Sequence, residues 1–142
     1  MARDYKLGFI RRTVNNIVTR QVEGDKGDGR VHLLTTVGRK TGRERTTPVT
    51  LVEVGGSRWL VAPYGEVGWV HNVRAAGVAT FSRGGRSERV RLVEAAAEEA
   101  APVLAHYLET VSIVRPFFDV AHDSPLTDIA REAHRHPVFR IS

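Results

Sequence analysis

The sequence predicts a mainly β fold with flanking helices (α+β), built as a small antiparallel barrel or sandwich. Short runs rich in β-branched residues recur along the chain, and the pairs Gly55–Gly56 and Gly84–Gly85 join neighbouring runs as tight hairpins would. Segments with apolar residues at helical spacing lie before, between and after these runs. With 142 residues, 42% of them hydrophobic, the chain has the size of one domain, so we expect a single domain over residues 1–142.

Strands are expected where a short apolar run is bounded by glycine or proline. We place them at residues 31–37, 48–54, 58–62, 78–83, 87–93 and 138–141. The first five lie within residues 31–93 and would form the barrel core. The last follows Pro137 and would add a strand to it.

Helices are expected at residues 1–22, 68–76, 98–111 and 126–135. The first combines an apolar face with a basic outer face, and a glycine-rich linker follows it. The second closes at Gly77, a residue type common just past a helix end. The third begins with Glu98 and Glu99, whose charges suit a helix N-terminus. Residues 97–142 would therefore hold the C-terminal helices and the last strand.

The chain carries a formal charge of +5 and no cysteine. Disulfides, thiolate catalysis and zinc–sulfur sites are therefore excluded. The cations form no long stripe and aromatic residues do not interleave with them, so we expect no nucleic-acid partner. No stretch has the pattern of a signal peptide or a membrane span, which predicts a cytoplasmic protein. Peripheral membrane contact through the basic helix 1–22 remains an alternative.

A basic turn, residues 38–45, lies between the first two expected strands. Its cations are Arg39, Lys40, Arg43 and Arg45. The glycines at either side of the first two cations can adopt conformations that turn successive backbone N–H groups toward a phosphate. On composition alone the turn is either a solvated hairpin tip or an anion site. It is not a nucleotide P-loop, because no glycine directly precedes Lys40.

Two motifs together resemble a known family. The run TTVGRKTGRERTTPV at residues 35–49 and the run VAPYGEVGWVHNVRAAGVAT at residues 61–80 look like the deazaflavin-dependent nitroreductase and quinone reductase family. These actinobacterial reductases use coenzyme F420 on a split β-barrel of the flavin-reductase, FMN-binding-like type. The resemblance runs from about residue 31 to about residue 93, and the two motifs occur in the right order at the right spacing.

The resemblance implies a hydride transfer from reduced F420 to a small electron-poor acceptor such as a quinone, a nitroaromatic or an activated enone. It implies that the basic turn holds the cofactor phosphate, while residues 62–65 and the following helix line the deazaflavin ring. The expected cofactor-binding residues are Gly38, Arg39, Lys40, Thr41, Arg45, Pro48, Ala62, Pro63, Tyr64, Gly65, Trp69 and Asn72. No catalytic residue is assigned; Tyr107 is a candidate proton donor, with solvent as the alternative.

Several alternatives stay open on the sequence. The same barrel could bind FMN, or could carry F420 without catalysis, as a monomer or a homodimer. Trp69 could be a core aromatic, and Asn72 could bond only to a nearby loop. Residues 114–119 could cover the pocket or pack as core. No metal is expected, because His134 and His136 lie two residues apart and would not share a helix face.

Overall fold

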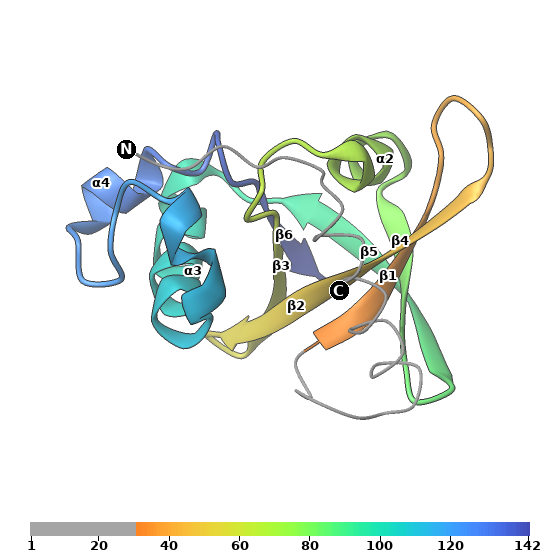
Figure 1. The fold of residues 1–142 in the computed structure, drawn as a ribbon, viewed down its shortest axis with the longest axis horizontal. Helices are drawn as coiled ribbons and strands as arrows, with labels where there is room; N and C mark the ends of the chain where they lie inside the picture. The colour runs from red at the N-terminus through yellow and green to blue at the C-terminus, as the bar shows by residue number, and fades with distance from the viewer. Residues whose placement is uncertain (1–30) are drawn as a thin grey trace.

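A closed six-stranded barrel forms the centre of the molecule (Figure 1), in a computed structural model that describes residues 31–142. Neighbouring strands are antiparallel, in the order β1-β2-β3-β6-β5-β4 around the barrel. The strands are β1 (Val31–Val37), β2 (Glu44–Val54), β3 (Ser57–Val61), β4 (Val78–Arg83), β5 (Arg86–Glu94) and β6 (Val138–Ile141). Closure pairs every strand on both sides and leaves no open sheet edge.

Alternating side chains divide the apolar residues into two clusters. The interior cluster fills the barrel with residues such as Leu34, Leu60, Phe81 and Phe139, each at most 2% exposed. The outer cluster begins on the other face of the same strands, where Val61 packs toward the helices. This two-residue alternation is what a strand buried on both faces requires.

Helices cover one side of the barrel. The long helix α3 (Ala97–Thr110) packs on β2, β3 and β6, and its buried residues form nearly half of the outer cluster. The 3₁₀ helix η1 (Ser112–Phe117) and the short helix α4 (Leu126–Ala130) follow it along the chain and lie on the same side (Figure 1). A separate helix, α2 (Gly68–Ala76), closes one end of the barrel with Val70 and Val73 in the interior cluster.

Most expected elements are confirmed, with two differences. Strand β2 begins at Glu44 rather than at Pro48, because the pairing with β1 continues through Arg45 as far as Val37. The helix expected over residues 126–135 ends at Ala130 and continues as tight turns. The expected helix 1–22 and linker 24–29 lie outside the described residues. No helix within residues 31–142 is long and apolar enough to cross a membrane.

Candidate functional site

Helix α2 belongs to the second motif and lies between the basic turn of the first motif and residues 62–67. The basic turn projects beyond the ends of β1 and β2 on one side of α2, and residues 62–67 run from β3 to the start of α2 on the other (Figure 1). Gly77 ends the helix in a left-handed conformation, with φ of 72°, and its N–H donates to the carbonyl of Val73. The fold therefore brings the two motifs to one end of the barrel.

The basic turn uses its own backbone groups to hold its shape. The N–H of Gly38 donates to the carbonyl of Arg43 at 2.7 Å, and the N–H of Gly42 donates to the carbonyl of Gly38 at 2.8 Å. The N–H of Arg43 donates to the Thr41 hydroxyl at 3.2 Å. A Cβ on Gly38 would lie 2.8 Å from that hydroxyl oxygen, so any larger residue there would displace the Thr41 side chain. Three of the N–H groups expected to face a phosphate are therefore hydrogen-bonded within the turn. The turn presents mainly its side chains to an anion.

Those side chains are exposed and mostly unpaired. Lys40, Arg43 and Arg45 are exposed, and none of their side chains makes a hydrogen bond or ion pair with another residue in the range 31–142. Glu44 is the acidic residue of the basic turn. Grouped cations without partners attract an anion strongly, since binding requires no internal ion pair to break.

Asn72 ties this turn to the barrel. Its side chain is 5% exposed, and its amide nitrogen donates to the buried Thr36 hydroxyl at 3.1 Å. Its carbonyl oxygen accepts both the backbone N–H of Arg39 and the Arg39 guanidinium, each at 3.2 Å. The Asn72 side chain therefore links Arg39 of the turn to Thr36 of the barrel wall.

Ion pairs anchor the far end of α2. Arg74 donates two hydrogen bonds to Glu94 on β5, both at 2.8 Å, and a third to Glu66 at 3.0 Å. The bond with Glu94 is the main reason that the pKa of Arg74 is raised. Glu66 belongs to the segment that precedes α2, so Arg74 connects that segment to the sheet.

The turn at residues 62–65 is supported from below. Ala62 is 1% exposed in the interior cluster, and its N–H donates to the carbonyl of Pro137 at 2.8 Å. Gly65 has φ of 88°, and a Cβ there would lie 3.3 Å from the carbonyl oxygen of Arg135. Tyr64 packs edge-on against Phe117, with ring centroids 5.0 Å apart. The partly exposed part of the expected ring site is thus Pro63 to Gly65.

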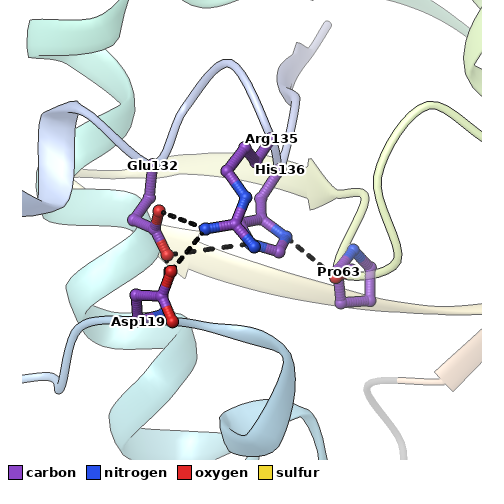
Figure 2. Close-up of polar contacts among 5 residues, drawn as sticks. All are labelled: Pro63, Asp119, Glu132, Arg135 and His136. Carbon is purple, nitrogen blue, oxygen red and sulfur yellow. Dashed lines mark hydrogen bonds and ion pairs between the residues drawn. The ribbon is translucent and has the colours of Figure 1, made fainter. Parts of the chain in front are cut away.

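A buried histidine lies beneath this turn (Figure 2). His136 is 4% exposed, and its Nδ1 lies 2.8 Å from the carbonyl oxygen of Pro63. Its ring stacks on Phe118 at 3.7 Å between centroids, and its Nε2 lies 3.9 Å from a Glu132 carboxylate oxygen. Arg135 bridges Glu132 and Asp119, at 3.3 Å and 2.7 Å. The sequence did not predict this cluster around His136, because 73 residues separate His136 from Pro63 and no local sequence pattern indicates the contact.

Burial lowers the pKa of His136 below its ordinary value of 6.5, although Glu132 acts in the opposite direction. Above pH 6.5 both folded and unfolded histidine are neutral. Below it the unfolded chain takes up a proton that the folded protein resists, so stability falls until the lower folded pKa is reached. We expect the unfolding free energy of the wild type to decline there relative to His136→Asn, by at most about 1.4 kcal/mol per pH unit.

Urea denaturation of both proteins at several pH values measures this difference, in which the other titrating groups cancel. Parallel pH profiles for the two proteins would show that His136 does not titrate differently on folding.

The remaining expected residues divide between the clusters. Trp69 is partly buried against the interior cluster, with its ring 6.0 Å from that of Phe139. Pro48 pairs with Leu33 within the barrel wall. Tyr107 is 2% exposed in the outer cluster, on the other face of the sheet from the cluster that Trp69 contacts. The structure therefore places Tyr107 in the core beneath α3 and separates it from the interior cluster that Trp69 contacts.

Residues 114–119 pack as core, and one of them also reaches the 62–65 turn. Val114 and Phe118 are buried in the outer cluster, while Phe117 contacts Tyr64 of the 62–65 turn. Within residues 31–142, no group of three or more His, Cys, Asp or Glu side chains is arranged to hold a metal ion.

Comparisons with known proteins add a family and a fold. The model of the F420H(2)-dependent quinone reductase family matches residues 8–120. A comparison with curated proteins gave no match.

Several solved structures share the barrel. One described as a domain-swapped dimer is 21% identical with a TM-score of 0.57, over 94% of this chain and 97% of that one. One described as an F420-H2 dependent reductase (FDR-A) is 24% identical with a TM-score of 0.50, over 82% of this chain and 96% of that one. A NimC/NimA family protein from Clostridium acetobutylicum is 14% identical with a TM-score of 0.55, over 95% of this chain and 88% of that one. The fold is thus the split β-barrel, FMN-binding-like type.

Proposed function

Because the chain belongs to the F420H(2)-dependent quinone reductase family, we propose that it reduces a small electron-poor acceptor, a quinone first of all, at the α2 end of the barrel. The protein is an F420-dependent reductase, and coenzyme F420 is its cofactor. Nitroaromatics and activated enones belong to the same chemical class of acceptor. The observation that carries the site assignment is that the basic turn and residues 62–67 lie on either side of α2, with the turn joined to α2 by Asn72.

The basic turn fits the phosphate and the acidic tail of this cofactor. Lys40 and Arg45 supply exposed charge that no protein carboxylate neutralises in residues 31–142, and Arg39 is oriented by Asn72. Arg39 and Arg45 carry forked donors that match pairs of phosphate oxygens. The donor set is therefore that of a polyanion site, with Arg43 as a further cation on the same turn.

The 62–65 turn fits a flat ring. Residues 63–65 are partly exposed while Ala62 is withdrawn into the interior cluster, so these three residues are the part of the turn that a ring can approach. Trp69 provides an apolar wall at the start of α2. A mostly apolar surface with a few backbone polar groups is the usual lining of a cofactor pocket.

When bound and reduced, F420 supplies the hydride. The protein's residues bind the anionic end, hold the ring-side turn in place and exclude water around Trp69. No side chain among the proposed site residues is assigned as the acid, so the proton that completes reduction of the acceptor comes from solvent.

Steady-state oxidation of F420H2, followed by absorbance with a soluble quinone, tests this proposal. We expect turnover that saturates in both substrates and a slower rate with a nitroaromatic. Tight F420 binding without oxidation by any of the three acceptor classes would instead identify a carrier of the cofactor.

A further inference from the structure

We propose that His136 is a positioning residue for the reductase, because its ring holds the carbonyl of Pro63 and thereby fixes the 62–65 turn that receives the cofactor ring. The inference rests on the proposed function for the role of that turn. His136 touches neither cofactor nor acceptor in this account; it acts through the backbone of the turn.

The contact assigns the tautomer of His136. A carbonyl oxygen only accepts hydrogen bonds, so Nδ1 carries the hydrogen that bridges the 2.8 Å to Pro63. The buried Nε2 then has no hydrogen-bond partner among residues 31–142 and faces the Glu132 carboxylate at 3.9 Å. A buried polar atom without a partner carries a cost in free energy, which indicates that the ring is kept in this orientation by its other contacts.

Glu132 is itself fixed in place beside the ring. It is 6% exposed, and it accepts the backbone N–H of Asp119 at 2.8 Å as well as the Arg135 guanidinium. The carbonyl of Glu132 accepts the N–H groups of both Arg135 and His136, so the chain turns tightly there and the histidine points back under the barrel end (Figure 2). Stacking on Phe118 fixes the plane of the ring.

The neighbours of His136 support the same turn. Pro137 accepts the N–H of Ala62, and the Arg135 carbonyl lies directly against Gly65. Residues 135–137 thus contact residues 62, 63 and 65 in succession. Within the turn itself the bond from Gly65 N–H to the Ala62 carbonyl is long, at 3.3 Å, so the turn depends on this support for its shape.

Three variants separate the hydrogen bond from the packing. His136→Phe keeps a ring that can stack on Phe118 but removes the donor to Pro63. His136→Asn places an amide nitrogen at the same bonded position as Nδ1, and His136→Gln moves it one bond further along. The Asn variant should behave like the wild type, and the Phe and Gln variants should not.

Hydrogen–deuterium exchange of the full-length protein without cofactor is the first readout. We expect exchange in the peptide covering residues 62–68 to be about tenfold faster in His136→Phe and His136→Gln than in the wild type and His136→Asn, since one net hydrogen bond is lost. A fluorescence titration with F420 is the second. We expect the dissociation constant to rise about tenfold in the same two variants, with the KM for the quinone unchanged.

Equal exchange in all four proteins overturns the inference, and so does faster exchange with unchanged F420 affinity. If His136→Phe does not fold, the Asn and Gln pair decides the question in the same way. Failure of the proposed function has a different signature, because the wild type itself would then not bind F420.

Discussion

Replacing Lys40 and Arg45 together by alanine is expected to weaken F420 binding by one to a few kcal/mol, about tenfold to several hundredfold in the dissociation constant. Both side chains are exposed on the basic turn and form no ion pair within residues 31–142, so the loss is one of ligand contact and not of fold. Affinity should also become less sensitive to salt, because two screened charge interactions disappear. Titrations at low and high ionic strength measure both effects.

A matched control removes the same charge elsewhere. Arg131 and Arg140 are exposed on α4's C-terminal side and on β6. Replacing both by alanine changes the net charge equally but should leave F420 affinity within about twofold, since distant exposed charges are largely screened. Equal losses in the two double variants would mean that net charge, and not the basic turn, attracts the cofactor. Unchanged affinity in Lys40→Ala/Arg45→Ala would remove the turn from the site.

Asn72→Ala is expected to cost about 1–3 kcal/mol of stability and to weaken F420 binding as well. The substitution leaves the buried Thr36 hydroxyl and the Arg39 N–H without their partner, and it releases the Arg39 guanidinium. The binding loss arises because Arg39 must then be ordered by the cofactor instead of by the protein. Urea denaturation and a fluorescence titration of the same preparation measure the two effects.

Thr36→Val separates them. It removes the hydroxyl on the barrel side of Asn72 and leaves both bonds to Arg39 intact. We expect a loss of stability with little change in F420 affinity. If Thr36→Val weakens binding as much as Asn72→Ala, the effect passes through general loosening of α2 and not through Arg39.

The strands and α2 could be predicted from the sequence because their signals are local. Glycine pairs mark the hairpins at Gly55–Gly56 and Gly84–Gly85, and Gly77 marks the end of α2. The basic turn was visible for the same reason. The hydrogen bonds inside the basic turn could not be predicted. A glycine that leaves N–H groups free for a ligand and a glycine that lets a turn bond to itself look the same in a sequence.

Contacts across the barrel end could not be predicted. In the sequence Asn72 is only a polar residue on a short helix. The structure places α2 beside the end of β1, and there the Asn72 amide bonds to Thr36 and Arg39. The helix expected over residues 126–135 ended early because Glu132 turns inward to Asp119, a contact that apolar periodicity does not encode. Tyr107 followed the helical pattern of α3 correctly, but the pattern could not say which face of the sheet it would meet.

The most direct test of the central claim, that the α2 end of this barrel is an F420 site built on the basic turn, is a fluorescence titration of the purified protein with F420 beside FMN. We expect saturable binding of F420 that weakens as salt is raised, and much weaker binding of FMN, whose single terminal phosphate uses fewer of the cations at residues 39–45. Binding of FMN in preference to F420, or F420 binding that salt does not affect, would contradict the account.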